Sequence, residues 1–136
     1  MNYWLVKSEP SVFAWDKLLK DKKVCWDGVR NYAARLNLRK MTKGDPVLFY
    51  HSNEGLAIVG IAKVLKENYQ DPTTKEDWSA VDLAPHKTLK KPVELSTVKA
   101  DRKLQNMYLV RQGRLSVMPV SEDEFNHILE LAGTSL

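Results

Sequence analysis

The sequence predicts an α+β protein whose strands form a small, curled, partly closed mixed β-barrel flanked by helices. Strand-like apolar runs and amphipathic helical segments both occur along the chain, and two neighbouring strands are joined as a hairpin. A glycine interrupts the second of these strands, and strands that curl at a bulge favour a barrel over a flat sheet. Residues 1–136 are expected to form a single domain, because no linker, repeat or low-complexity tract divides them.

The N-terminal third is predicted to hold one strand, two helices and a short extended stretch. Residues 2–8 include four consecutive apolar residues, which is typical of a central strand buried on both faces. A helix over residues 10–20 should follow. Its apolar face would comprise Val12, Trp15, Leu18 and Leu19. After an extended stretch at residues 24–29, Asn31 is placed to cap a helix that reaches Met41, and Gly44 would end it.

The middle of the chain is predicted to be a β-hairpin followed by a polar loop. Residues 46–52 and 56–67 have the composition of strands, and Asn53, Glu54 and Gly55 form the short loop between them. Gly60 lies inside the second strand, where glycine indicates a bulge or the close approach of a bulky group. Residues 68–77 are polar and are expected to form a loop.

The C-terminal part is predicted to contain two strands and two helices. A strand follows Trp78 and is expected to break at Pro85, and a short helix should cover residues 94–102. Residues 115–120 form the last predicted strand. Ser121 and Glu124 then make a capping box for a final helix. The core side of that helix would consist of Phe125, Ile128, Leu129 and Ala132.

Composition and charge exclude several classes of protein. The formal net charge of +4 permits an anionic partner without requiring one. Cys25 is the only cysteine, so no internal disulfide is expected and a reducing compartment is favoured. The sequence predicts neither a signal peptide nor a membrane-spanning segment. The three histidines lack the spacing of a zinc site, so we expect no metal and no cofactor.

The sequence contains no catalytic signature, and we do not expect an enzyme. Cys25 with His51 as its base is one conceivable nucleophilic pair, but a buried thiol without a catalytic role is the better interpretation. Glu9 or Asp27 acting as a general base on a nucleotide or a modified base is the alternative function. A protein-interaction module is a third alternative, and its mark would be an exposed apolar patch.

Tryptophan is frequent in this sequence and suggests a binding site. Trp4 and Trp15 fit core positions, whereas Trp26 and Trp78 stand beside polar residues at element boundaries. Each boundary tryptophan is either ordinary packing or one wall of a pocket for a flat base.

Polar and basic residues cluster around the boundary tryptophans. Those at the ends of elements are either caps and turns or groups that hydrogen-bond the edge of a base. They are Lys7, Ser8, Glu9, Asp27, Asn31 and Ser52. The cations near Trp26 are either a solvated helix face or partners of phosphates or of internal carboxylates. They are Arg30, Arg35 and Arg39.

Five segments, in order along nearly the whole chain, resemble the EVE domain family. They are YWLVKSEP at residues 3–10, WDGVRNYAAR at 26–35, FYHSN at 49–53, GIAKV at 60–64 and RLSVMPV at 114–120. The family belongs to the PUA-like superfamily and is related to YTH domains. The resemblance implies a curled β-barrel flanked by helices. It further implies binding of modified bases without catalytic activity, notably modified cytosines in DNA and, less strongly, bases in RNA.

The resemblance also assigns roles to particular residues. Lys7, Ser8 and Glu9 of the first segment would lie at the pocket. Trp26 would form one wall of an aromatic cage, with Asp27 and Asn31 at the edge of the base.

The remaining roles are assigned in the same way. Trp78 would form the opposing wall, Tyr32 a further wall or barrel packing, and Ser52 a last pocket residue. Apart from the resemblance, Arg30, Arg35 and Arg39 are expected to contact the nucleic-acid backbone, because stacking nearly cancels the cost of unpairing a base and useful affinity then needs such contacts. The partner implied is a nucleic acid with a modified base, DNA in preference to RNA, in the cytoplasm of a bacterium or the nucleus of a eukaryote.

Overall fold

The computed structural model describes all 136 residues and contains both helices and strands. The strands are β1 (Tyr3–Ser8), β2 (Val24–Trp26), β3 (Pro46–His51), β4 (Ala57–Gln70), β5 (Ser79–Glu94) and β6 (Val117–Val120). The α-helices are α1 (Trp15–Asp21), α2 (Tyr32–Lys40), α3 (Leu95–Ala100), α4 (Tyr108–Arg111) and α5 (Glu122–Leu131). A short 3₁₀ helix, η1, covers Arg102–Leu104.

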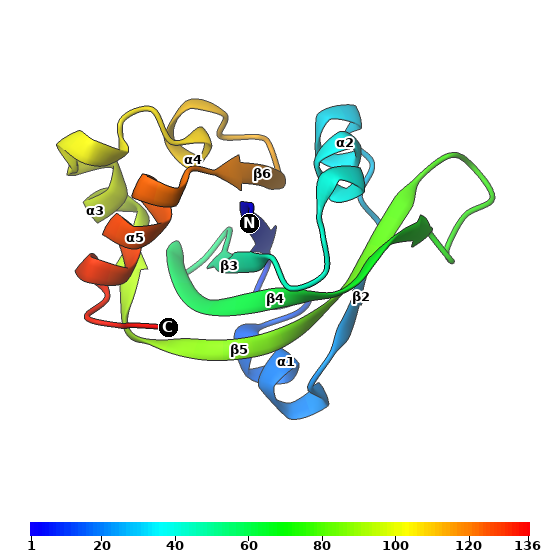
Figure 1. Ribbon diagram of the computed structural model, residues 1–136, viewed down its shortest axis with the longest axis horizontal. Helices are drawn as coiled ribbons and strands as arrows, with labels where there is room; N and C mark the ends of the chain where they lie inside the picture. The colour runs from blue at the N-terminus through cyan, green and yellow to red at the C-terminus, as the bar shows by residue number, and fades with distance from the viewer.

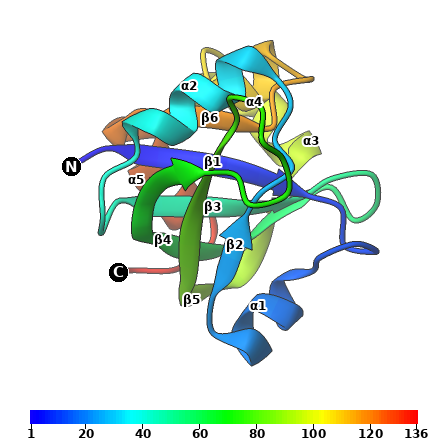
Figure 2. The same ribbon diagram turned by 90° about the vertical axis from the view of Figure 1, so that its right-hand side faces the viewer.

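All six strands belong to one mixed sheet in the order β2-β5-β4-β3-β1-β6. Strands β1 and β3 are parallel, and every other neighbouring pair is antiparallel. The sheet curls strongly but does not close, so β2 and β6 remain as its two edges (Figures 1 and 2). The predicted fold class is confirmed, and the partly closed barrel takes the form of this curled, unclosed sheet.

The sheet separates two hydrophobic clusters. One cluster lies between the sheet and the helices α3, α4 and α5, which gather at one end of the molecule in Figure 1. The other includes residues from α1 and α2. Strand β1 serves both, because Leu5 belongs to the first cluster while Trp4 and Val6 belong to the second. The prediction that residues 2–8 form a strand buried on both faces is therefore confirmed.

The curl of the sheet is accompanied by a close contact between Gly60 and Trp15. A Cβ atom at residue 60 would lie 2.3 Å from two carbons of the Trp15 indole, so only glycine leaves room for the ring. The indole nitrogen donates a hydrogen bond to Thr88 on β5 at 2.9 Å. Pairing between β4 and β5 shifts register at Ile58–Gly60. The prediction of a bulge or a close approach at Gly60 is confirmed, and both occur together.

Helix α1 begins five residues later than predicted. Residues 9–13 form a turn in which the backbone N–H groups of Val12 and Phe13 both donate to the carbonyl of Glu9. The Ser8 hydroxyl also donates to the Phe13 carbonyl at 2.6 Å, and this bond holds the turn against β1. Val12 is consequently 75% exposed, and its predicted place on a helical apolar face is wrong.

Strands β4 and β5 are longer than the sequence indicated. Strand β4 continues to Gln70, so only residues 71–78 connect it to β5. Strand β5 passes through Pro85 without ending, because Pro85 lies beside a register shift at Ile61–Ala62, where the ladder is already irregular. The predicted break at Pro85 is therefore wrong.

The helix ends follow local capping chemistry. The Asn31 side chain accepts a hydrogen bond from the Ala34 N–H at 3.0 Å, which confirms the predicted cap of α2. Ser121 and Glu124 form the predicted capping box of α5. Helix α2 ends at Lys40, and Gly44 instead adopts a positive φ in the turn that leads into β3. None of the helices is long and apolar enough to cross a membrane.

Replacing Gly60 with alanine should destabilise the protein, because the new methyl group would overlap the rigid indole of Trp15. We expect the free energy of unfolding, measured by urea denaturation, to fall by about 3 kcal/mol. Gly113→Ala is the matched control, since no atom lies within 4 Å of its added Cβ. The control should change stability by less than about 0.5 kcal/mol. An equal loss of unfolding free energy in Gly60→Ala and Gly113→Ala would contradict the idea that the new methyl group overlaps Trp15.

Candidate nucleic-acid interface

A cavity of about 760 Å³ lies where the curled sheet fails to close. Its walls come from the end of β1, the turn at residues 9–13, strand β2 and the connection from β2 to α2, with Ser116 just before β6. The edge strand β2 and the β1–β6 side of the sheet thus face each other across it. This volume is within the range of about 300–1,000 Å³ that is typical of ligand pockets.

An aromatic wall lines the cavity. The half-buried Trp26 meets Phe13 edge-on, with 6.2 Å between ring centroids, and packs against the fully buried Phe49 at 5.7 Å. Trp26 therefore has a fixed orientation while part of its ring remains accessible. Sequence reasoning missed Phe13, because the segment that contains it was assigned to a helix. The Pro10 turn after a buried strand was the available signal.

The end of β1 contributes three of the predicted residues. Ser8 is buried, and its hydroxyl supports the turn that carries Phe13. Lys7 donates to the Gly113 carbonyl at 2.7 Å, and partial burial lowers the pKa of its ammonium group. Glu9 is exposed at the rim of the cavity. A cation and a carboxylate therefore stand next to each other along one side.

The connection from β2 to α2 supplies the opposite side. Asp27 is exposed and lines the cavity. Gly28 has a φ of 75°, a conformation that other residues rarely adopt. Asn31 uses its side-chain oxygen to cap α2, which leaves its NH₂ group free to donate to a ligand. Trp26, Asp27 and Asn31 are therefore brought together, as the sequence predicted.

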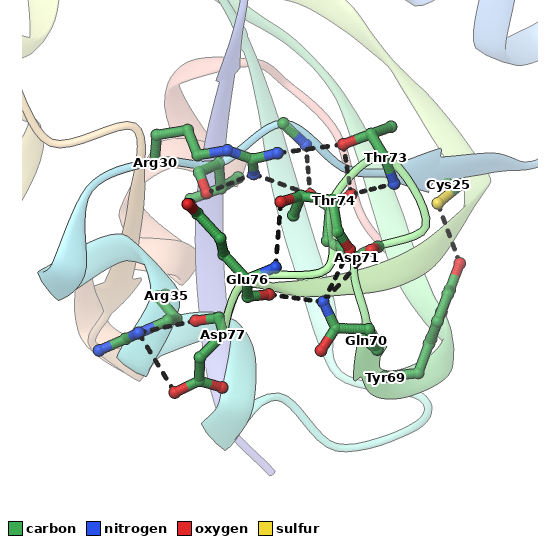
Figure 3. Close-up of polar contacts among 12 residues, drawn as sticks. Cys25, Arg30, Arg35, Tyr69, Gln70, Asp71, Thr73, Thr74, Glu76 and Asp77 are labelled. Atoms are coloured by element: carbon green, nitrogen blue, oxygen red, sulfur yellow. Dashed lines mark hydrogen bonds and ion pairs between the residues drawn. The ribbon is translucent and has the colours of Figure 1, made fainter.

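The buried carboxylate of Asp71 anchors this connection (Figure 3). It accepts hydrogen bonds from the Gly28 N–H at 2.9 Å, the Arg30 guanidinium at 2.9 Å, and both the backbone N–H and the hydroxyl of Thr73 at 2.7 and 2.6 Å. Burial alone would raise the pKa of Asp71, but the bonds from Thr73, Arg30 and Gly28 outweigh it and hold that pKa far below its usual range. Sequence reasoning missed Asp71, which was assigned to a polar turn.

Trp78 and Tyr32 do not line the cavity. They stack on each other with 5.4 Å between centroids and an interplanar angle of 25°. The guanidinium of Arg35 lies 4.9 Å from the Tyr32 ring and 5.1 Å from the Trp78 ring. Because Asp77 ion-pairs with Arg35 and Arg39, the 71–78 connection holds Trp78 over α2 and away from Trp26. The structure therefore does not place Trp78 opposite Trp26.

Ser52 also lies outside the cavity lining. It follows β3, and its backbone N–H donates to the Ser8 carbonyl at 2.9 Å. Strand β3 pairs with β1 on the side opposite β6, whereas the cavity opens between β1 and β2. Ser52 thus supports the end of β1 through its backbone, and its side chain is not part of the candidate site.

The three predicted backbone-binding arginines all have carboxylate partners within the chain. Arg30 pairs with Asp71 at 2.9 Å, while Arg39 and Arg35 pair with Asp77 at 2.7 and 3.5 Å. Of the alternatives left open by the sequence, the internal carboxylate is therefore the one observed. Arg30 also lines the cavity and remains partly exposed.

Cys25 and His51 each have separate partners. The Tyr69 hydroxyl hydrogen-bonds to the Cys25 sulfur at 3.0 Å (Figure 3). It also hydrogen-bonds to Asp82, and burial raises the pKa of the Cys25 thiol. His51 accepts from the Trp15 backbone N–H at 3.0 Å, and burial lowers the pKa of its imidazole. These contacts do not favour a thiolate nucleophile or a Cys–His pair. No three metal-binding side chains lie close enough together to hold a metal ion.

Comparison with a family model and comparison with individual proteins lead to the same group of relatives. A family model described as EVE domain matches residues 2–131. Thymocyte nuclear protein 1 of Mus musculus is 38% identical over 168 residues, which covers 98% of this chain and 74% of the mouse protein. That aligned length exceeds the 136 residues of this chain, so the mouse protein carries insertions relative to it.

Solved structures agree with this match. Rpa0253 from Rhodopseudomonas palustris is 44% identical with a TM-score of 0.94, over 98% of this chain and 94% of that chain. Human THYN1 in complex with DNA containing 5-methylcytosine is 34% identical with a TM-score of 0.91, over 100% of both chains. The YTH domain of Zygosaccharomyces rouxii MRB1, in complex with N6-methyladenosine RNA, is 14% identical with a TM-score of 0.64, which shows a shared fold alone.

Replacing Asp71 with asparagine should weaken the anchor of the β2–α2 connection. We expect the free energy of unfolding at pH 7 to fall by about 2 kcal/mol, because the asparagine amide cannot accept all four hydrogen bonds that the buried carboxylate accepts. Asp77→Asn is the control. Its carboxylate side chain is 79% exposed, so the loss should stay below about 1 kcal/mol.

The same variant should change the pH dependence of stability. The folded pKa of Asp71 is depressed, so its contribution is complete above the unfolded value of about 3.9 and is lost as pH falls below it. Urea denaturation between pH 7 and pH 3 should therefore show a smaller acid loss in Asp71→Asn than in the unmodified protein. An unchanged acid profile would contradict the role assigned to this carboxylate.

Proposed function

This chain belongs to the EVE domain family, and on that premise we propose that it recognises a modified base in nucleic acid. The base would occupy the cavity beside Trp26, and a modified cytosine in DNA is the ligand we favour. The family assignment made from five sequence segments is confirmed. The proposal goes further, because it names a ligand and the residues of this chain that would contact it.

The observation that carries the proposal is the position of Trp26. Its indole is held edge-on by Phe13 and Phe49 at the gap in the sheet, and part of it faces a cavity with polar residues at its rim. A flat base stacks favourably on such an aromatic surface, whatever its identity. Phe13 also lines this cavity, but its ring stands at 82° to that of Trp26, so it would border the base and not form the opposing wall that the sequence assigned to Trp78.

The polar rim supplies partners for the edge of a cytosine. The carboxylate of Asp27 or Glu9 can accept a hydrogen bond from the exocyclic amine, as carboxylates do with cytosine N4. The NH₂ group of Asn31 can donate to a ring acceptor. Val12, Val24 and Val29 also line the cavity and would provide an apolar surface for a methyl substituent.

Energetics favour a base that is unpaired or flipped out of its helix. Stacking on an aromatic side chain contributes about 1–3 kcal/mol per base, whereas unpairing a base costs a few kcal/mol. These terms nearly cancel for a duplex. Single-stranded ligands should therefore bind more tightly than duplexes of the same sequence, unless backbone contacts offset the difference.

The relatives support DNA over RNA as the ligand. Human THYN1 has been crystallised with DNA that contains 5-methylcytosine, and this chain is 34% identical to it along its full length. A protein with this role would act in the cytoplasm of a bacterium or in the nucleus of a eukaryote.

We favour binding over catalysis. Cys25 and His51 hydrogen-bond to Tyr69 and Trp15 and not to each other, and the raised pKa of Cys25 disfavours its nucleophilic form. The alternative of Glu9 or Asp27 as a general base predicts turnover. Incubation with free nucleotides and modified nucleosides, followed by chromatography, tests that alternative directly.

The Trp26→Ala variant should lose most of its affinity for a single-stranded oligonucleotide with one 5-methylcytosine. Removal of the stacking surface is worth about 1–3 kcal/mol, which corresponds to a 5- to 150-fold rise in Kd. Fluorescence anisotropy with end-labelled oligonucleotides measures this change. The set would differ at one base among cytosine, 5-methylcytosine, 5-hydroxymethylcytosine, adenine and N6-methyladenine.

Tyr32→Ala is the matched control, because Tyr32 is 69% exposed and stacks outside the cavity. It should retain the preference among bases that the unmodified protein shows. The proposal would be overturned by a protein that ignores the identity of the base, or by a Trp26→Ala variant with unchanged affinity for every oligonucleotide.

A further inference from the structure

A groove of about 370 Å³ lies between α2 and α4, next to the base cavity. Figures 1 and 2 show these two helices on the same side of the sheet, with β6 between them. Its lining includes Asn31, Leu36 and Lys40 from the α2 side, and Tyr108, Arg114 and Leu115 from the α4–β6 side.

The charge of this groove is entirely positive. Lys40 and Arg114 are both exposed, and neither forms an ion pair within the chain. None of the lining residues is acidic. Arg35 and Arg39 differ in this respect, because a phosphate would have to displace Asp77 to reach them. Lys40 and Arg114 can therefore accept an anionic partner without losing an internal contact.

The groove adjoins the base cavity. Asn31 lines both, and Leu115 in the groove adjoins Ser116 in the cavity. The loop before β6 is also tied to the cavity, because Lys7 donates to the carbonyl of Gly113 at 2.7 Å. A strand whose base enters the cavity would therefore continue directly into the groove.

The uncharged part of the groove suits the nucleotide next to the one whose base occupies the cavity. Tyr108 is 43% exposed and Leu36 is 51% exposed, so both present apolar surface to a neighbouring base. The α2 wall of the groove is fixed in place, since Asn37 donates to the Val117 carbonyl at 2.7 Å and thereby ties α2 to β6. A preformed surface of this kind binds without the cost of ordering it.

We propose that the α2–α4 groove binds the sugar-phosphate backbone of the strand that carries the recognised base, with Lys40 and Arg114 as its phosphate ligands. This inference rests on the proposed function and extends it. It transfers the role of backbone contact from Arg35 and Arg39, whose charges are neutralised by Asp77, to two cations that sequence reasoning did not select.

The test compares oligonucleotides of two lengths. A 12-mer and a trinucleotide, each with one central 5-methylcytosine, would be titrated against the unmodified protein and the Lys40→Gln, Arg114→Gln double variant. The double variant should bind the 12-mer about tenfold or more weakly near 0.1 M salt. A plot of log Kd against log salt concentration should also have a slope smaller by about 1.4, which is about 0.7 for each lost phosphate contact. Its preference for 5-methylcytosine over cytosine should remain.

The matched control removes two other exposed cations, Lys20 on α1 and Lys63 on β4, both to glutamine. This control has the same net charge as the groove variant and should keep the 12-mer affinity and salt slope. Equal losses in the two double variants would overturn the proposal, since only general charge would be involved. A groove variant that binds the 12-mer normally but loses binding to polyglutamate would overturn it too, and would assign the groove to an acidic protein partner.

The two proposals fail separately. An unmodified protein without preference for any modified base would contradict the proposed function. If the groove variant still lost its length-dependent affinity in that case, the backbone contact would stand. Conversely, suppose that the unmodified protein prefers a modified base and that the groove variant has the same salt slope as the unmodified protein. The proposed backbone contact in the groove would then be wrong, while the proposed function would stand.

Discussion

The carboxylate of Asp71 joins the two parts of the chain on which the candidate site depends. It is buried in the connection between β4 and β5, and its hydrogen bonds reach Gly28 and Arg30 in the connection between β2 and α2. That second connection carries Trp26, Asp27 and Asn31 to the cavity. Since β2 is only three residues long and lies at the edge of the sheet, strand pairing alone gives it little support. The orientation of the aromatic wall therefore depends on a carboxylate that lies 43 residues from Gly28 in the sequence.

The unclosed sheet explains why the cavity lies where it does. Strands β2 and β6 are the unpaired edges of the sheet. Helix α2 spans the opening, because Asn37 is bonded to β6 and Arg39 is bonded to Ser79 on β5. The ends of β1 and β2 leave a space that Trp26 and Phe13 only partly fill. In a closed barrel, side chains would occupy this space. The incomplete closure thus leaves an open cavity at the edge of the core, and this cavity is the candidate site.

The sequence predicted those features that depend on local chemistry. Apolar runs located β1 and β3, cap residues located α2 and α5, and Gly60 marked the contact with Trp15. Trp26, Asp27 and Asn31 were grouped correctly because six consecutive residues hold them together. The sequence did not indicate the position of Trp78 or the partners of Arg35 and Arg39, since both depend on how the 71–78 connection folds over α2 and on Asp77 within it. Long-range charge pairing of this kind has no signature in a single sequence.

The central claim is that the base stacks on Trp26 and on no other tryptophan. In a ¹⁵N-labelled protein, the four indole N–H signals can be followed while a single-stranded oligonucleotide with one 5-methylcytosine is added. The signal of Trp26 should shift most. The signals of Trp4 and Trp15 should stay in place, because their N–H groups are bonded to Asp45 and Thr88 inside the protein. Binding that shifts Trp78 and leaves Trp26 unmoved would contradict the account and place the base on the Tyr32–Trp78 stack instead.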